Sequence, residues 1–218
     1  MTGVLEIFLA IILLSVLFSL SSSRLMTLIK LMAIQGALVS LTPVFLGTEA
    51  MLSNEGLFLF LSTLVVKAVV IPTLLWFALT RIAIKREIEP LIGYHASVAA
   101  GLCLILAAGF IAQALESLAQ DIPSMVLITA ITTLGGGLFL MMSRTKAISQ
   151  VIGYLMLENG IYLMGTALAA RQTRSLYLIE FGVLLDLLVG VMIMGIILNN
   201  ISRAFDDMDT TYLEQLKD

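Results

Sequence analysis

The sequence is poor in the residues that build metal centres, disulfide frameworks and water-exposed surfaces. Its 218 residues include one cysteine, one histidine and one tryptophan, and only 12% are charged. The single cysteine, Cys103, excludes an intrachain disulfide and a thiolate metal cluster, and one histidine cannot build a metal site. Apolar residues make up 60% of the chain, against roughly 45–50% in soluble domains. The sequence therefore indicates an integral membrane protein without a soluble domain of useful size.

Seven apolar runs are long enough to cross a hydrocarbon core of about 30 Å. Short segments rich in serine, glycine, proline and charged residues separate them. The sequence thus predicts an all-α fold, a polytopic membrane helix bundle with seven transmembrane helices. The first run has no basic leader or cleavage motif, so we expect it to be retained. The predicted helices cover residues 3–20, 25–46, 56–80, 94–115, 123–142, 148–170 and 176–199.

The basic residues between the predicted helices indicate how the bundle is oriented. By the positive-inside rule, the side of the membrane that is richer in Lys and Arg is the cytoplasmic side. Arg171 and Arg174 lie on one side, and seven basic residues lie on the other. We therefore expect the N-terminus outside and residues 201–218 as an acidic cytoplasmic tail. The seven basic residues are Arg24, Arg81, Lys85, Arg86, Arg144, Lys146 and Arg203.

Three ionisable side chains, Lys67, Glu158 and Asp186, lie near the midpoints of predicted helices. Each costs about 2.5–3.5 kcal/mol at the centre of a membrane helix, so each needs a partner or internal water. Lys30 and Glu180 lie closer to helix ends and can reach the interface by snorkelling. We count all five among the candidate proton-pathway residues.

Three interpretations of the central groups remain open. In the first, Lys67 pairs with Glu158 or Asp186 in a buried ion pair that only fixes how the helices pack. In the second, the three groups lie beside internal water and form a proton relay, in which the carboxylates accept and release protons. In the third, the same groups bind a small cation.

A proline near the central lysine favours the relay. Pro72 has no backbone N–H to donate to the carbonyl of Ala68, and its ring crowds that turn. We therefore expect a helix break at Pro72. Carbonyl groups freed next to Lys67 are suited to holding water where the backbone lines a cavity.

Polar residues around Glu158 extend the candidate pathway. Tyr154 and Tyr162 stand one turn before and one turn after Glu158, on the same face of the helix. Both tyrosines, and Asn159, can hydrogen-bond to the carboxylate or to water beside it. His95, the only histidine, lies at the expected cytoplasmic start of a helix, as an interfacial residue or as a proton-uptake group.

Several motifs resemble known membrane subunits. The stretch GYLMLENG, Gly153–Gly160, and the spacing of Lys67 and Pro72 resemble component E of the hydrogenase-4 and formate hydrogenlyase type of membrane-bound nickel–iron hydrogenases. This resemblance extends over nearly the whole chain. The last three helices resemble the K subunit of respiratory complex I, in which a basic loop leads to Ile-Gly, an acid and an asparagine. The third K helix carries an acid followed four residues later by glycine, as Asp186 and Gly190 do here.

The match to the K subunit has two differences. In the K pattern the acid of the middle helix lies two residues after the glycine, where this chain has Leu155. The acid of this chain, Glu158, comes one turn later and so stays on the same helix face. In the last helix Asp186 replaces a glutamate and is one methylene shorter.

The longest polar loop and the resemblance together divide the chain. Residues 1–90 form an N-terminal three-helix group that ends with this loop, and residues 91–122 hold a fourth helix. Residues 123–200 form a complex I subunit K-like three-helix unit, followed by the tail.

The resemblance implies a proton-pathway membrane subunit of a multisubunit nickel–iron hydrogenase, coupling electron transfer in partner subunits to proton translocation. Such a chain is a non-catalytic subunit of an oxidoreductase complex in the prokaryotic cytoplasmic (inner) membrane. Its expected partners are antiporter-like subunits, other membrane-arm subunits and the lipid bilayer, with no nucleic acid. The nickel–iron (NiFe) centre and iron–sulfur clusters are expected in partner subunits, and no cofactor or metal in this chain. The alternatives are a subunit of a multisubunit sodium/proton antiporter and a passive membrane scaffold.

Overall fold

The computed structural model is helical over almost all the residues it describes. These are residues 2–46, 54–81, 91–115 and 123–169, together with residues 189, 190, 192, 193 and 195. A π-helical segment, Val66–Val70, joins α3 and α4 into one long rod. The bounds of the helices are α1 Thr2–Ser21, α2 Leu25–Phe45, α3 Asn54–Val65, α4 Ile71–Arg81, α5 Tyr94–Leu115, α6 Ser124–Ser143 and α7 Ala147–Ala169.

Six helices in this described part of the chain are long and apolar enough to cross a membrane, when the α3–α4 rod is counted once. Each begins and ends within two residues of a helix predicted from the sequence. The prediction of an all-α membrane helix bundle is therefore confirmed for these residues. The seventh predicted helix, residues 176–199, lies almost entirely outside them, and so does the predicted tail.

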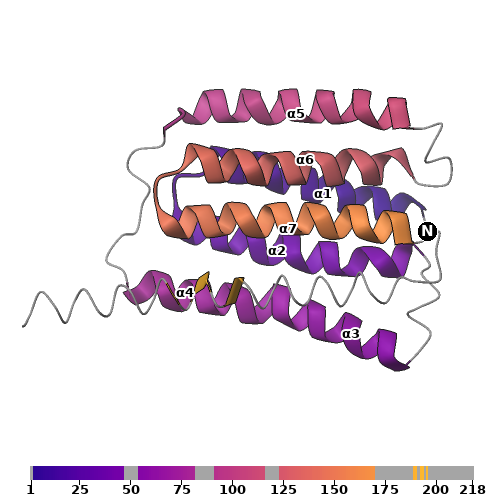
Figure 1. Ribbon diagram of the computed structural model, residues 1–218, viewed down its shortest axis with the longest axis horizontal. Coiled ribbons are helices and arrows are strands. Elements are labelled where there is room, and N and C mark those ends of the chain that lie inside the picture. The colour runs from indigo at the N-terminus through magenta and orange to yellow at the C-terminus, as the bar shows by residue number, and fades with distance from the viewer. Residues whose placement is uncertain are drawn as a thin grey trace, which may run out of the picture.

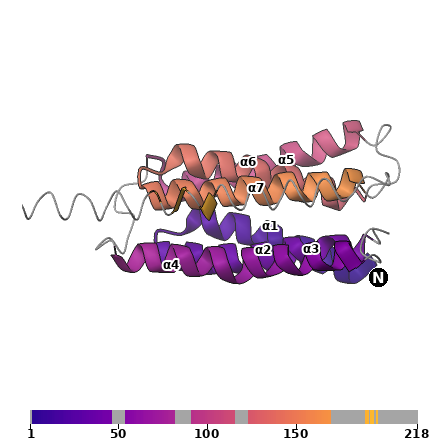
Figure 2. The ribbon, with the colours of Figure 1, turned by 60° about the horizontal axis from the view of Figure 1, so that its bottom comes forward.

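The helices lie side by side along one direction, as Figure 1 shows. In Figure 2 they form two layers, with α5, α6 and α7 in one and α1, α2 and the α3–α4 rod in the other. Contacts join the layers, because α6 packs against α1 and α7 packs against α2. Helix α7 therefore contacts both α6 in its own layer and α2 in the other.

Two clusters of buried apolar side chains fill the bundle, one toward each end of the helices. The connection-end cluster lies near the turns that join α1 to α2 and α6 to α7; its members include Val16, Leu20, Leu28, Met32, Leu140, Ile152 and Met156. The far-end cluster lies toward the opposite ends of the same helices; its members include Leu5, Ile12, Val39, Val126, Ala130 and Leu163. Along α1, α2, α6 and α7, the members of one cluster are replaced by those of the other near mid-length. Polar residues occupy the interval between them.

Glycines allow α6 and α7 to pack with their backbones close together. A Cβ atom added at Gly153 of α7 comes within 2.8 Å of the backbone nitrogen of Met141 in α6. At Gly160 it comes within 2.8 Å of the Cα of Leu134, and at Gly136 it meets a methyl group of Val16 in α1 at 2.7 Å. Small residues of this kind are how membrane helices gain packing contacts, because burial of apolar surface gives no driving force inside lipid.

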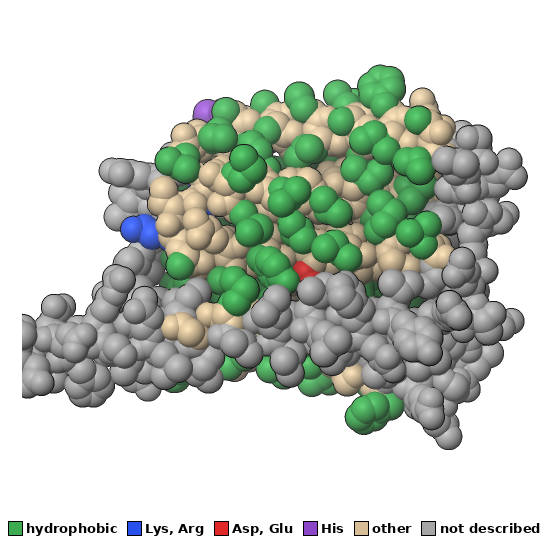
Figure 3. Space-filling model, in the orientation of Figure 1, with side chains coloured by type: hydrophobic (Ala, Val, Ile, Leu, Met, Phe, Trp, Pro, Cys, Tyr) green, Lys and Arg blue, Asp and Glu red, His purple; other side chains and the backbone are tan. Residues whose placement is uncertain are grey.

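Helix α5 forms the outer edge of its layer and buries the smallest share of its side chains among the six spans. It packs against α1 and α6 through small residues such as Gly101 and Ala108. Its opposite side exposes Leu102, Leu106 and Phe110, and Cys103 is exposed beside them. Figure 3 shows hydrophobic side chains spread over the face formed by α5, α6 and α7, as expected for a surface in contact with lipid or other apolar protein.

Arg144 holds three parts of the chain together at the connection end. Its side chain is 1% exposed, and Nη2 donates hydrogen bonds to the carbonyl oxygens of Leu20 at 2.9 Å and Ser22 at 3.3 Å. Its guanidinium carbon also lies 5.0 Å from the centre of the Tyr94 ring, at the start of α5. The carbonyl of Leu20 is among the last in α1, where no helical N–H is available, so Arg144 acts as a cap from a distant segment.

Replacing Arg144 with leucine is expected to lower the free energy of unfolding by about 1–3 kcal/mol, because the buried carbonyl of Leu20 and the partly buried carbonyl of Ser22 lose their donor. The loss is limited because Nε and Nη1 of Arg144 have no hydrogen-bond partner among the described residues. Denaturation of the purified protein in detergent measures the change. The matched control is Arg24→Leu, an exposed arginine at the same end, which should change stability by less than about 0.5 kcal/mol. Equal effects of the two substitutions would contradict the capping role.

Candidate functional site

Lys67 lies at the middle of the α3–α4 rod, thirteen residues after Asn54 and fourteen before Arg81. It belongs to the π-helical segment, in which the N–H of Ile71 bonds to the carbonyl of Val66. Such a segment widens the helix and is common at functional sites. The segment ends at Val70, two residues before Pro72, which cannot supply a regular helical hydrogen bond.

The backbone around Pro72 is satisfied in part by a neighbouring hydroxyl. Thr73 donates its side-chain hydrogen bond to the carbonyl of Val69 at 2.6 Å. Side-chain hydroxyls and local π-helical geometry are the usual means by which membrane helices tolerate proline. The sequence predicts a helix break at Pro72, whereas in the structure the helix continues through this residue and the backbone adjusts by a π-helical segment just before it.

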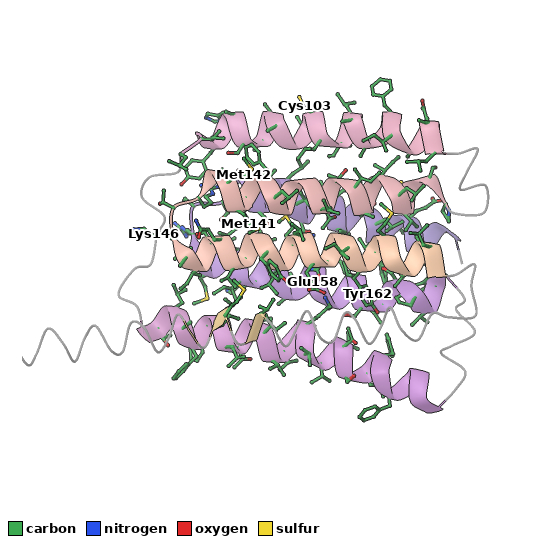
Figure 4. All side chains as sticks on the ribbon, in the orientation of Figure 1. Cys103, Met141, Met142, Lys146, Glu158 and Tyr162 are labelled. Carbon is green, nitrogen blue, oxygen red and sulfur yellow. The ribbon has the colours of Figure 1, made fainter. Side chains whose placement is uncertain are left out.

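Glu158 of α7 forms an ion pair with Lys67 through Oε1. The ammonium of Lys67 also donates to Oδ1 of Asn159 at 3.1 Å and lies 5.2 Å from the centre of the Tyr162 ring. Three side chains within about one turn of α7, those of Glu158, Asn159 and Tyr162, therefore surround the lysine. Figure 4 shows Glu158 and Tyr162 on the same side of α7, one turn apart.

Helix α2 closes the site from another side. A Cβ atom added at Gly36 would lie 3.2 Å from both the Cβ and the carbonyl oxygen of Lys67. Glycine at this position thus lets α2 approach the backbone of the π-helical segment. As a result, the ion pair is almost fully enclosed, with Lys67 4% exposed and Glu158 1% exposed.

The ion pair belongs to a wider set of buried polar residues at mid-length of the helices, which we call the polar layer. Glu158 lies eleven residues from each end of α7, and Gln35 lies ten residues from each end of α2. At a rise of 1.5 Å per residue, both are about 15 Å or more from the helix ends. The members of the layer are Ser15, Gln35, Lys67, Thr132, Thr133, Glu158 and Asn159, each buried.

Several atoms of the polar layer are left with unused hydrogen-bonding capacity. Among the described residues, Oε2 of Glu158, both amide atoms of Gln35 and the hydroxyl of Thr132 have no hydrogen-bond partner. Burying such groups without a hydrogen bond is unfavourable, so buried polar groups are usually hydrogen-bonded to water or to another partner. The layer thus has the capacity to bind water or protons beyond the ion pair itself.

The remaining candidate residues from the sequence are placed less centrally. Tyr154 is partly buried one turn before Glu158 and packs against the connection-end cluster. Lys30 is exposed on α2, six residues before Gly36, and so does not join the buried ion pair. His95 is exposed at the start of α5. Asp186 and Glu180 lie outside the described residues, and the roles of all these residues remain predictions.

Gln35, Thr132 and Thr133 are polar-layer residues that the sequence analysis missed. Uncharged polar residues cost less than ionisable ones inside a membrane and are often buried there, so they are a weaker signal in the sequence. The available signal was position, because Gln35 stands at the centre of an apolar run and is followed by glycine. Across the described ranges, no group of three or more His, Cys, Asp or Glu residues lies close enough together to hold a metal ion.

Comparison with known proteins gives relatives in bacteria. The chain is 30% identical to the uncharacterized protein Rv0085 of Mycobacterium tuberculosis over 195 residues, which cover 88% of this chain and 86% of the relative. It is 23% identical to hydrogenase-4 component E of Escherichia coli K12 over 178 residues, 81% of each chain.

The second match supports a distant relation, and hydrogenase-4 component E of Shigella flexneri matches equally well. No family model matches the chain, and no solved structure matches it. The extent of the first match nevertheless shows common descent along most of the sequence. The chain is a multi-pass membrane protein that belongs to the same family as Rv0085 of Mycobacterium tuberculosis.

Proposed function

We propose that this chain is a proton-pathway membrane subunit of a hydrogenase-related complex, with Lys67 and Glu158 at the centre of the relay. The observation that carries the proposal is the enclosed ion pair at mid-length of the bundle, set within a layer of buried polar side chains. Ionisable residues at that depth are costly and typically mark ion or proton pathways. The distant relation to hydrogenase-4 component E supports the assignment to a hydrogenase-related complex.

The contacts of Lys67 suggest how the relay works. A proton that reaches Glu158 neutralises the carboxylate and removes most of its attraction for the ammonium group. Lys67 then still has Asn159 and the ring of Tyr162 as partners, so it can shift without leaving the polar layer. Release of the proton restores the ion pair. The site therefore has two arrangements whose balance depends on the proton, as a relay requires.

The proposed relay extends beyond the ion pair. Asp186, on a seventh membrane helix, is the next carboxylate of the relay, and Tyr154, Lys30 and Glu180 serve its outer parts. The N-terminus faces outward and the basic connection end faces the cytoplasm, across the cytoplasmic membrane of a prokaryote. Residues 123–200 form the K-like unit beside antiporter-like subunits, and the nickel–iron and iron–sulfur centres lie in partner subunits.

A passive scaffold is the second candidate, and the burial of the ion pair favours it. A salt bridge that is enclosed on all sides is compatible with a purely structural role, in which it fixes the register and packing of the helices. In that case Glu158 never changes its protonation state during turnover. The two candidates differ in what happens when the acid loses its ability to ionise but keeps its shape.

Glu158→Gln is expected to reduce proton translocation by the assembled complex about tenfold or more, because the amide cannot take up and release a proton. Proton uptake by membrane vesicles, measured with a pH-sensitive dye while the complex turns over, records the rate. Glu6→Gln removes an exposed acid on α1 and is the control, with no expected change. Normal translocation by an assembled Glu158→Gln complex would leave the scaffold as the better function.

Copurification tests the assignment to a complex independently of the relay. The tagged chain, extracted from its native membrane in a mild detergent, should bring down a nickel-binding large subunit and antiporter-like membrane subunits. Sodium-transport subunits without a nickel protein, together with sodium-dependent turnover, would instead assign the chain to a sodium/proton antiporter.

A further inference from the structure

The buried residues of the α3–α4 rod recur at every fourth position through the π-helical segment. In a regular α-helix, residues four apart are offset by about 40° around the axis, so five such positions spread over about 160°. A π-helical turn takes up more residues than an α-helical turn, so the segment Val66–Val70 removes part of this offset. It thereby keeps Lys67 on the side of the rod against which α2 packs. The five buried positions are Thr63, Lys67, Ile71, Leu75 and Leu79.

Gly36 of α2 lies directly against Lys67. A Cβ atom added at Gly36 would lie 3.2 Å from the Cβ of Lys67, 3.2 Å from its carbonyl oxygen and 3.5 Å from its carbonyl carbon. These three nearest atoms belong to one residue, and two of them are backbone atoms of a helix, which cannot turn aside as the end of a flexible side chain can. A side chain at position 36 would therefore press the backbone of Lys67 away from α2.

The side chain of Lys67 starts beside α2 and ends at α7. Its Cβ faces Gly36, whereas its ammonium bonds to Glu158 and Asn159. Helix α2 packs against both the π-helical segment and α7. The closeness of α2 to the rod therefore limits how far the backbone of Lys67 stands from the carboxylate that its ammonium must reach.

We propose that Gly36 is a positioning residue for the ion pair. By leaving room for the backbone and Cβ of Lys67, it sets the position from which the ammonium reaches Glu158. Transfer reactions depend steeply on the placement of the groups involved, and a displacement of about 1 Å can cost about 100-fold in rate. The inference rests on the proposed function for its effect on proton translocation, whereas the placement of the ion pair can be measured without it.

A glycine that served close packing alone would behave differently from Gly36. Small residues let membrane helices approach one another, whether or not an ion pair is near. Gly135 of α6 is such a residue, because a Cβ atom added there would lie 3.1 Å from a methyl carbon of Leu104 in α5. Gly135→Ala therefore introduces similar crowding on another pair of helices and is the matched control for Gly36→Ala.

Infrared spectroscopy of the full-length chain, purified with the subunits it retains, tests the position of the ion pair. The bands of the Glu158 carboxyl group are those that disappear in Glu158→Gln. Gly36→Ala is expected to displace these bands, because the ammonium of Lys67 moves relative to Glu158, and to lower proton translocation by the assembled complex about tenfold. Gly135→Ala should leave both the bands and the rate unchanged.

The two readouts separate the positioning role from the proposed function. Undisplaced Glu158 bands in Gly36→Ala would overturn the positioning role, whatever the rate of translocation. Displaced bands with normal translocation would support the positioning of the ion pair by Gly36 and would count against the relay.

Stability in a chain without the ion pair separates positioning from crowding. In the double variant Lys67→Met with Glu158→Leu, methionine keeps the Cβ and the carbonyl group that face Gly36, but no ion pair is left to displace. Adding Gly36→Ala is expected to lower the melting temperature less in this double variant than in the natural chain. If Gly36→Ala prevents the natural chain from folding, the triple variant should still fold. Equal losses in the two chains, or failure of both to fold, would overturn the proposal.

Discussion

Replacing Glu158 with leucine is expected to destabilise the folded bundle by about 3–5 kcal/mol, because the ammonium of Lys67 is left buried without its carboxylate. Asn159 and the Tyr162 ring remain as partners, but neither carries a compensating negative charge. Titration of the purified protein with a denaturing detergent measures the loss. Lys67→Met alone should produce a comparable loss, since it strands the carboxylate instead.

The double variant Lys67→Met with Glu158→Leu separates the cost of an unpaired charge from the contribution of the pair. Replacing a buried ion pair by apolar residues of similar volume is often neutral or stabilising. The double variant should therefore recover most of the stability lost by either single change, and it should not recover proton translocation. Lys30→Met, at an exposed lysine of α2, is the control for removal of a charge. Additive losses in the double variant would show that the two groups do not interact.

Replacing Gly160 with valine is expected to disrupt the packing of α6 against α7. Even the first carbon of a side chain at this position lies 2.8 Å from the Cα of Leu134 and 2.9 Å from its Cβ. Backbone atoms cannot move aside as the end of a flexible side chain can, so the two helices must separate. We expect a loss of about 3 kcal/mol or more, at the upper end of the cost of overpacking.

Gly109→Ala provides the matched control, because nothing lies within 4 Å of a Cβ atom added there. Alanine favours a helix over glycine by about 1 kcal/mol, so this variant should be as stable as the wild type or more so. Thermal unfolding of the two variants, Gly160→Val and Gly109→Ala, compares them directly. Similar melting temperatures would mean that α6 and α7 are not held as closely as the glycine contacts require.

The positions of the membrane helices could be read from the sequence because their length is dictated by the thickness of the bilayer. The six described spans were found in this way to within two residues. The partner of Lys67 could not be read in the same way. Pairing with Glu158 depends on how far each helix rotates about its axis, and close contacts such as the one at Gly36 determine that rotation.

Two other features of the site could not be predicted from the sequence, for physical reasons. A proline in a membrane helix is compatible with a kink, a break or a widened turn, and only its surroundings choose among them. At Pro72 the result is a widened turn. The π-helical hydrogen bond from Ile71 to Val66 and the bond from the Thr73 hydroxyl to Val69 satisfy the backbone carbonyls there. Gln35 carries no charge, so its presence in an apolar run indicates a functional site less strongly than that of Lys67 or Glu158.

The outward side of α5 has a practical consequence. Cys103 is the only cysteine of the chain and is exposed on this helix, so the natural protein accepts one fluorophore at one known place without any mutation. A dye attached there senses hydrocarbon when the helix borders lipid, and its emission changes when another polypeptide covers it. A fluorophore on this natural cysteine therefore reports whether another subunit covers α5 in the assembled complex.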